Sequence, residues 1–400
     1  MREIWKILLY LINSFPVLFI ILVLYIFKYL TLIQILSLYL VYCIYWQIFS
    51  KVTFTYTRNQ ENDELIKKCP SLINPKYKPH FLLPLCPFQM LICEYWKPEQ
   101  GKQLTYKTEN VNKYGTKILW TKFSYMEKEF TDEPILMLFP GMTGITEDGY
   151  VQNLAYEGLT KGYNVVIFQM RILSEDFSIN ESGTFRYYDD IDEALDYIIN
   201  KHKNSKIFAI AGSYGANNLV YYLGYLNSKK KKIHAAVSIS NPYDLELCER
   251  LLEETIFSWI ITYLERKNFK RIRKGAENCK YNDLNIDFIS NCDDMKSYDE
   301  EFTRKLLGYK SADDYYRSAS ALRQFDKINV PLLCINSKDD GLTSCRAIPY
   351  DDIRLNKNVF LLVTDKGAHM CFFCNEKFFG LKQWHLKPIF EFLSACNNIS

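Results

Sequence analysis

The sequence predicts an α/β domain in which a mostly parallel sheet is flanked by helices. Short apolar runs without polar alternation recur along the chain, and residues 134–139 and 164–169 are clear examples. Strands covered on both faces have this pattern, because neither face meets water. Stretches with helical apolar spacing separate these runs, which is the order expected of parallel strands joined by helices. A third observation is Ser213, which lies where a predicted strand passes directly into a helix.

The composition excludes several classes of protein. Hydrophobic residues make up 48% of the 400 residues and charged residues 24%, so the chain is neither disordered nor collagen-like. The 49 basic and 46 acidic side chains lack the basic excess of a nucleic-acid-binding protein, so we expect no nucleic-acid partner. Among the 12 cysteines, only Cys371 and Cys374 form a CxxC pair, without a second pair at zinc spacing. We expect neither a metal nor a cofactor.

The first 50 residues differ from the rest of the chain. Two apolar stretches, residues 7–27 and 29–49, each approach the ~20 residues that a membrane-spanning helix needs. No small-residue cleavage site separates them, as it would in a secretory signal peptide. We expect residues 1–50 to be a membrane anchor with one or two spans that contributes nothing to the catalytic fold. The expected location is therefore a membrane, with the endomembrane system as the compartment.

Residues 51–115 are expected to wrap over the domain as an extended segment. Five prolines between residues 63 and 91 exclude long regular elements there. The alternation of strands and helices begins near residue 116, so the α/β domain is expected at residues 116–400. Charged helical sequence at about residues 245–326 indicates a small helical cap inserted over the sheet. The predicted strands are residues 117–123, 134–139, 164–169, 205–211, 234–240, 331–336 and 358–363, and the predicted helices include residues 190–202, 217–226 and 382–395.

Ser213 is the candidate nucleophile. It follows the predicted strand at residues 205–211 and precedes a helix, in the order Ala211-Gly212-Ser213-Tyr214-Gly215. A serine at such a sharp turn occupies strained backbone, so the residues two before and two after it must be small. Ala211 and Gly215 meet that requirement.

A nucleophilic serine needs a base and an acid that orients the base. Of the five histidines, His369 is the one that follows a late predicted strand, at the sheet edge where sites in open parallel sheets lie. Asp339 and Asp340 both follow the strand at residues 331–336. Asp340 is the preferred acid because it directly precedes the turn at Gly341, and Asp339 is the alternative.

The candidate oxyanion hole consists of two backbone N–H groups. One belongs to Tyr214, the residue after the candidate nucleophile. The other belongs to Met142, in the glycine-containing loop after residues 134–139. Two such donors stabilise the negative charge that develops on oxygen when a serine attacks a carbonyl.

With these residues placed, the chain resembles the AB hydrolase 4 family of the α/β-hydrolase superfamily. It looks most like the membrane-anchored abhydrolase-domain proteins that include phospholipases and lipases. The segments that carry the resemblance are residues 138–144, 237–245, 308–320 and 333–349, together with the loop to His369. The resemblance implies an α/β-hydrolase fold, a serine esterase or lipase activity, and Ser213, Asp340 and His369 as the charge-relay residues.

The sequence departs from the family pattern at three places. Ala216 follows the elbow where the family often has glycine, and Ala368 stands where glycine is usual before the histidine. Met170-Arg171-Ile172 replaces an Asn-Arg-Gly motif after the third predicted strand. None of these changes removes a catalytic group, so they bear on substrate preference.

The leading hypothesis is a membrane-anchored serine hydrolase that cleaves carboxylic esters of lipids, phospholipid or acylglycerol, through an acyl-enzyme intermediate. An anchor would keep the active site beside such a substrate, so the partners would be the lipid ester and the bilayer. Two alternatives are a general carboxylesterase acting on short soluble esters and a non-catalytic α/β-hydrolase-like binding module. Loss of a triad residue would indicate the module, and all three residues are present. The sequence leaves the oligomeric state open.

Overall fold

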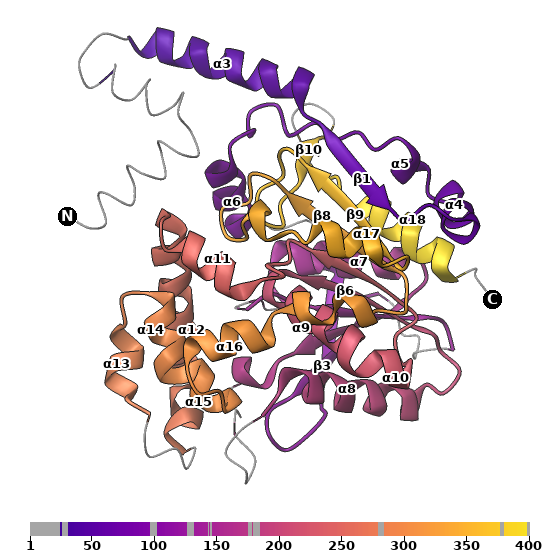
Figure 1. Ribbon diagram of the computed structural model, residues 1–400, viewed down its shortest axis with the longest axis vertical. Helices are drawn as coiled ribbons and strands as arrows, with labels where there is room; N and C mark the ends of the chain where they lie inside the picture. Colours follow the sequence, from indigo (N-terminus) through magenta and orange to yellow (C-terminus); the bar gives the residue numbers. More distant parts are fainter. Residues whose placement is uncertain are drawn as a thin grey trace.

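A nine-stranded sheet forms the centre of the molecule in the computed structural model (Figure 1). The structure describes residues 25, 31–96, 102–125, 132–142, 144, 146–174, 178, 185–278, 284–376 and 380–397. The strand order is β1-β9-β8-β7-β6-β4-β5-β3-β2. The strands are β1 (Val52–Tyr56), β2 (Leu104–Asn110), β3 (Lys117–Phe123), β4 (Ile135–Phe139), β5 (Asn164–Gln169), β6 (Ile207–Gly212), β7 (Ala235–Ile239), β8 (Leu332–Ser337) and β9 (Val359–Thr364).

The predicted fold class is confirmed. The strands from β5 through β4, β6, β7 and β8 to β9 pair in parallel, whereas β1, β2 and β3 pair with their neighbours in antiparallel fashion. Every residue of β4, β6, β7, β8 and β9 is buried, as their unbroken apolar runs predict. These strands place the ends of β4, β6, β8 and β9, and the loops that follow them, at one edge of the sheet.

Helices cover both faces of the sheet. One face packs against α8 (Tyr187–Lys201) and α9 (Ser213–Tyr222), which the π-helical turn η3 (Leu223–Asn227) continues. The other face packs against α7 (Gly149–Thr160) and α18 (Leu386–Asn397), with α4 (Gln60–Lys67) and α5 (Pro70–Ile73) beside α18. The result is a three-layer α/β/α arrangement with two cores, one on each side of the sheet.

The segment at residues 51–115 supplies both edge strands, β1 and β2, so the expected boundary at residue 116 leaves out part of the sheet. The positions of these strands are mostly half-buried or exposed, because an edge strand is only partly covered. The prolines lie between the two strands. Pro70 and Pro87 occupy the first turns of α5 and α6 (Cys86–Tyr95), where a missing N–H costs no hydrogen bond.

The helix predicted at residues 382–395 begins later than expected. Residues Leu381–Gln383 form β11, which pairs with β10 (Phe373–Asn375) in a small antiparallel ribbon, and α18 starts at Leu386. Local apolar spacing did not reveal this ribbon because its partner strand lies in the loop after His369.

The insertion after β7 is helical, as the sequence indicates, and its helices lie together beside one end of the sheet (Figure 1). Buried aromatic side chains, among them Phe269, Tyr298 and Phe302, hold the helices together. The insertion contains α11 (Leu245–Leu252), α12 (Ile256–Asn278), α13 (Ile286–Asn291), α14 (Met295–Tyr298), η4 (Asp299–Thr303), α15 (Arg304–Leu307), α16 (Ala312–Ala319) and η5 (Ala321–Lys327).

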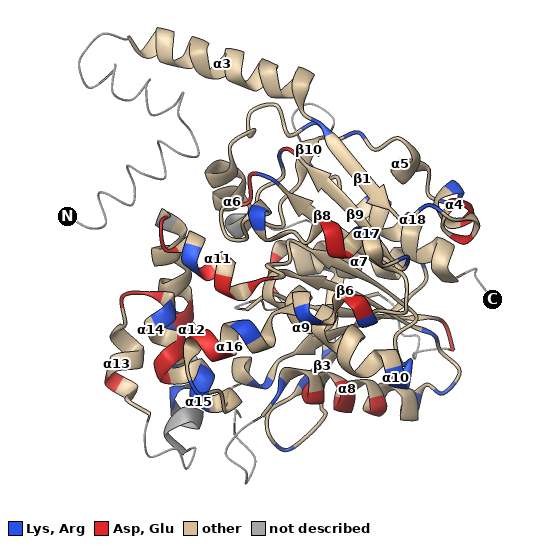
Figure 2. Ribbon diagram, viewed as in Figure 1, with Lys and Arg blue, Asp and Glu red and all other residues tan. Residues whose placement is uncertain are grey.

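The helix α3 (Leu32–Phe49) precedes β1 and carries no charged residue (Figure 2). By length and composition alone, it is a helix that could cross a membrane. The other predicted apolar stretch, residues 7–27, lies outside the described residues apart from Tyr25. One side of α3 contacts the domain: the Tyr39 hydroxyl donates to the Leu82 carbonyl at 2.8 Å, and Gln47 Nε2 donates to the Pro79 carbonyl at 2.5 Å. The expectation that residues 1–50 contribute nothing to the fold is therefore wrong for α3.

Candidate active site

Ser213 lies at the junction of β6 and α9 with a φ of 55°, a left-handed conformation that is strained for a residue with a side chain. Tight packing around the junction maintains this conformation. A Cβ atom added to Gly215 would lie 2.1 Å from the Pro140 carbonyl oxygen, so only glycine fits there. Ser213 itself is partly exposed, whereas its neighbours on both sides are buried. This is the geometry expected of a nucleophile elbow.

The loop after β4 and the loop that carries His369 both pack around this junction. A Cβ atom at Gly141 would lie 3.2 Å from the Ser213 Cβ and 3.7 Å from its Oγ, so the Gly141 backbone approaches the serine closely. A Cβ atom at Gly212 would lie 2.3 Å from the Met370 methyl group. The neighbours of Ser213 and of His369 are therefore in direct contact.

His369 and Asp340 form a close pair. The His369 Nδ1 atom lies 2.9 Å from Asp340 Oδ2 and 3.1 Å from Oδ1. The Asp340 side chain is fully buried and also accepts hydrogen bonds from the Leu342 N–H, the Thr343 N–H and the Thr343 hydroxyl. Burial opposes ionisation of Asp340, but the charge and hydrogen bond of His369, with the bonds from Thr343, lower its pKa below the ordinary value. Asp340 is thus held as a carboxylate facing the imidazole.

Asp339, the alternative acid, has different partners. Its Oδ1 accepts from the Ser337 hydroxyl at 2.5 Å and from the Ala368 N–H at 2.9 Å. Burial raises the pKa of Asp339, and the Lys366 ammonium, 3.6 Å from its Oδ2, opposes that shift. Asp339 therefore binds the backbone of the residue before His369, whereas Asp340 binds the imidazole.

The loop that carries His369 has a strained backbone. Positive φ angles occur at Gly367 (151°), Ala368 (52°), Met370 (63°) and Phe372 (45°). Ala368 adopts a left-handed conformation, which explains why glycine suits this position. The Ser240 hydroxyl accepts the Met370 N–H at 3.1 Å, and the Gly367 carbonyl accepts the Phe372 N–H at 2.8 Å. One hydrogen bond from another part of the chain and one within the loop thus hold the loop in its unusual conformation.

Lys366 is a feature of this site that the sequence analysis missed. Its side chain is buried, and its ammonium lies 4.2 Å from the centre of the Trp46 ring and 3.3 Å from the Tyr42 hydroxyl, both on α3. No sequence pattern near Lys366 could predict its role, because the rings that cover it lie about 320 residues earlier in the chain. Through Lys366, Asp339 and Ala368, the helix α3 is in contact with the loop that carries His369.

The two residues whose N–H groups are the candidate oxyanion donors both line one cavity, although Ser213 is not among its lining residues. Met142 and Tyr214 line it together with Met170 and Ile172 from the loop after β5. The Gly141 N–H is engaged elsewhere, since it donates to the Tyr150 hydroxyl at 3.0 Å, which fixes the loop after β4. Tyr150 gave no signal in the sequence. The departures at residues 170 and 172 both line this cavity.

Arg171, the central residue of that departure, has a structural role. Its guanidinium forms a buried ion pair with Asp190 of α8 and packs against the rings of Phe185 and Tyr114. Both charged groups are almost fully buried, so removal of either one would leave an uncompensated buried charge. The pair fixes the loop after β5 against the start of α8.

Three of the other histidines do not enter the site. His385 is fully buried just before α18, and burial lowers its pKa to about 3, so it is neutral. Burial also lowers the pKa of His202 and His234, which lie at the opposite ends of strands and helices from Ser213. Within the described ranges, no three or more histidine, cysteine, aspartate or glutamate side chains gather as metal ligands.

Comparison with known proteins identifies the family of the chain. The family model described as "alpha/beta hydrolase fold" matches residues 134–376, more than half of the chain. The chain belongs to the α/β hydrolase family, and its resemblance to abhydrolase-domain lipases is confirmed.

Several named relatives show what the chain is similar to. It is 25% identical over 240 residues to a phospholipase ABHD3 of Bos taurus, which covers 60% of this chain and 58% of that protein. It is 25% identical over 273 residues to a monoacylglycerol lipase of Saccharomyces cerevisiae, covering 65% of this chain and 59% of the lipase. It is 24% identical over 373 residues to an abhydrolase domain-containing protein of Dictyostelium discoideum, covering 85% and 92% of the two chains. The chain thus spans less than two thirds of the phospholipase and of the lipase.

Among solved structures, an esterase of Pyrococcus furiosus matches with a TM-score of 0.42 and 17% identity, over 68% of this chain and 87% of that one.

Proposed function

We propose that the protein is a serine hydrolase that cleaves carboxylic esters of lipids through Ser213, His369 and Asp340. The observation that carries the proposal is the His369–Asp340 pair, 2.9 Å apart, on a loop packed against the strained Ser213 junction. A histidine with one nitrogen fixed by a buried carboxylate has the arrangement of a general base for an adjacent serine.

In the proposed reaction, His369 Nε2 takes the Ser213 hydroxyl proton while Ser213 Oγ attacks the ester carbonyl. The imidazolium then gives this proton to the leaving alcohol as the C–O bond breaks, which leaves an acyl-enzyme. Water then attacks the acyl carbonyl while His369 takes one of its protons, and the imidazolium returns that proton to Ser213 Oγ as the acyl–Oγ bond breaks, which releases the carboxylic acid and restores the free enzyme. The Asp340 carboxylate keeps the proton of the neutral imidazole on Nδ1 and stabilises the imidazolium in each step.

The negative charge that develops on the carbonyl oxygen needs donors. The Tyr214 and Met142 N–H groups are proposed for this role, since Tyr214 directly follows Ser213 and Met142 follows Gly141, whose backbone approaches the serine closely. With the Gly141 N–H held by Tyr150, the next N–H along this loop is that of Met142.

The lipid nature of the substrate is supported by the relatives' names, phospholipase and monoacylglycerol lipase, and by α3. An apolar helix attached to the domain would hold the site beside a bilayer. A general carboxylesterase would use the same residues, so we propose the lipid ester as the substrate class and the soluble ester as the alternative. Membrane location is part of the proposal.

Labelling by a fluorophosphonate, which reacts with activated serines, tests the proposal. The wild-type protein is expected to be labelled and to hydrolyse short acyl esters, whereas Ser213→Ala loses the label and several orders of magnitude in turnover. Ser228→Ala is the control, because Ser228 lies at the far end of the helix that Ser213 begins and its hydroxyl bonds only the Gly224 carbonyl, so it should retain the label. A labelled Ser213→Ala protein would contradict the assignment. An unlabelled wild-type protein would favour the binding module.

A further inference from the structure

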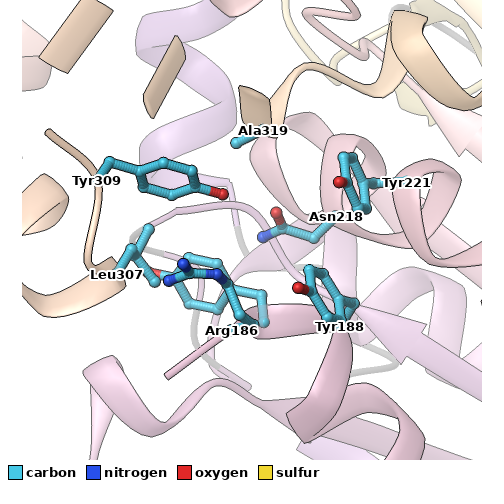
Figure 3. Close-up of a pocket in the computed structure, with 8 residues that line it drawn as sticks. Arg186, Tyr188, Asn218, Tyr221, Leu307, Tyr309 and Ala319 are labelled. Atoms are coloured by element: carbon cyan, nitrogen blue, oxygen red, sulfur yellow. The ribbon is translucent and has the colours of Figure 1, made fainter. Parts of the chain in front are cut away.

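A second pocket lies away from Ser213, between the start of α8, the middle of α9 and the cap (Figure 3). Aromatic side chains form most of its wall. Tyr188 and Tyr221 stack with their ring centres 5.5 Å apart and their planes 12° apart, and Tyr309 of the cap lies opposite them. Leu307 and Ala319 complete the apolar part of the lining. The mechanism proposed above uses none of these residues.

Arg186 brings a positive charge to this pocket. Its guanidinium lies 4.7 Å from the centre of the Tyr309 ring, and its Nη1 donates to the adjacent Phe185 carbonyl at 3.1 Å. In the part of the chain that the structure describes, it forms no salt bridge of 4 Å or less with a carboxylate. Burial raises the pKa of Asp189, and the nearby positive charge of Arg186 opposes that shift. The pocket therefore holds a cation that is packed on a ring and that no carboxylate of the described residues approaches within 4 Å.

Uncharged donors surround the same space. The hydroxyls of Tyr188, Tyr221 and Tyr309 point inward around the carboxamide of Asn218 (Figure 3). Burial raises the pKa of Tyr188 to about 12, so this hydroxyl stays protonated at neutral pH. Phenols and a carboxamide can each donate a hydrogen bond to an acceptor placed between them.

The start of α8 adds further donors. Arg186 is the residue that precedes α8, and no side chain caps the helix. The N–H groups of the first turn have no partner within a helix, and the helix dipole favours negative charge at this end. The first of these N–H groups belong to Tyr187 and Tyr188, which both line the pocket.

We propose that this pocket binds a phosphate group. One guanidinium, three phenols, a carboxamide and helix N–H groups provide more donors than the two oxygens of a carboxylate can accept, whereas a phosphate offers three or four oxygens. Arginine suits phosphate because its planar fork matches two of those oxygens. The aromatic wall would contact the organic part of the ligand.

The pocket adjoins the cavity beside the elbow. Tyr187 lines both spaces, and its ring is 5.7 Å from that of Tyr214. A phosphate held at Arg186 would thus be separated by the Tyr187 side chain from the cavity that Met142 and Tyr214 line. The phosphate could belong to a phospholipid headgroup or to a free phosphate ester, and the chemistry at Arg186 is the same for both.

Calorimetric titration of the full-length protein in detergent micelles tests the proposal. The ligand is sn-glycerol 3-phosphate, with uncharged glycerol and with acetate as comparison ligands. The Ser213→Ala variant is used throughout, so that binding is measured without turnover and the result does not depend on the hydrolase proposal. The expected result is saturable binding of the phosphate ester that is at least tenfold tighter than that of acetate, with no binding of glycerol.

Variants locate the site. Arg186→Met should weaken binding roughly tenfold to a hundredfold, because it removes a charge-assisted pair of hydrogen bonds. Tyr309→Phe keeps the ring that packs on Arg186 and removes one donor, so a loss of about threefold to tenfold is expected. Arg354→Met, an exposed arginine on α17 (Tyr350–Leu355), is the matched control and should bind as before.

Three outcomes would overturn the proposal: no binding of the phosphate ester, equal affinity for acetate, or unchanged binding in both Arg186→Met and Tyr309→Phe. Thermal unfolding of each variant shows whether a loss of binding reflects a loss of fold, and Tyr309→Phe remains informative where Arg186→Met unfolds. Adding micellar phosphatidylglycerol with short acyl chains then distinguishes the sources. Displacement of bound sn-glycerol 3-phosphate by this lipid indicates that the pocket accepts a phospholipid headgroup. No displacement indicates that the ligand is a free phosphate ester.

Discussion

Asp339 and Asp340 are adjacent residues with separate partners. Asp340 faces the His369 ring, and Asp339 accepts the Ala368 N–H. We expect Asp340→Asn to lower turnover on a short soluble ester by on the order of 10⁴, because an amide no longer holds the correct tautomer of the imidazole. Asp339→Asn should cost far less and act through the loop, with a lowered melting temperature. Parallel kinetics and thermal unfolding decide this, and equal losses of turnover would contradict the assignment.

Gly215 is a residue for which the structure gives a steric prediction. Gly215→Ala would place a methyl group 2.1 Å from the Pro140 carbonyl oxygen, on backbone that cannot rotate away. We expect the free energy of unfolding to fall by ~1–3 kcal/mol, as overpacking in a core usually costs. Chemical denaturation measures this loss. Gly162→Ala is a contrasting control, because no atom lies within 4 Å of its added Cβ, although its φ of 87° adds backbone strain.

A residue of the site could be predicted from the sequence when the residues that define its role lie near it in the chain. Ser213 has a local signature, since the small residues around it are its immediate neighbours in the chain. His369 and Asp340 were reached by their position after late strands, and the structure brings them together at 2.9 Å. Lys366 and Tyr150 have partners that only the folded chain supplies, so no pattern near them could indicate a role.

At the scale of elements, α3 is the helix whose contacts change the expectation drawn from sequence. Its Trp46 ring covers the Lys366 ammonium, which lies 3.6 Å from Asp339 and so close to the His369 loop. We expect Trp46→Leu to lower kcat on a short soluble ester by about twofold to tenfold with little change in KM, because a cation–π contact is worth roughly 0.5–2 kcal/mol.

The control for this variant is Trp259→Leu. Trp259 is an exposed tryptophan on α12 whose ring stacks on Tyr263. Both variants are compared in the same detergent, so that membrane attachment does not enter. If Trp46→Leu and Trp259→Leu have the same kcat, α3 does not position the loop.

The strands show which elements a sequence can predict. β3 and β5 have the predicted bounds, and the central strands differ from prediction by one or two residues at their ends. Unbroken apolar runs are a strong signal because burial on both faces requires them. β1 and β2 were missed for the same reason: they are edge strands with one partner each, and their polar alternation resembles that of an exposed segment.

For the whole molecule, buried carboxyl groups in the cap predict how stability depends on pH. Burial and the neighbouring Asp299 carboxylate raise the pKa of Glu265 to about 8, and burial raises that of Asp299 to about 6. The folded state therefore holds protons that the unfolded state has released, so the stability present below about pH 4 is lost progressively up to about pH 8.

Glu265→Gln tests this, since the amide cannot ionise. The melting temperature of the wild-type protein should fall between pH 6 and pH 8, and that of Glu265→Gln should fall less over the same range. If the melting temperatures of the wild-type protein and Glu265→Gln change with pH in parallel, Glu265 does not titrate in the folded protein within this range.

The pairing of β1 with β9 has a consequence for how the protein is made. Val52 lies opposite Thr364 in this pairing. The ribosome therefore synthesises β1 about 300 residues before the strand with which it pairs. At roughly 5–20 residues per second, that delay is roughly 15–60 s. Throughout this interval β1 is an unpaired strand with free backbone groups beside an apolar helix, which is the kind of segment that aggregates. A chaperone that binds near residue 52 during this interval would cover that segment until β9 is made.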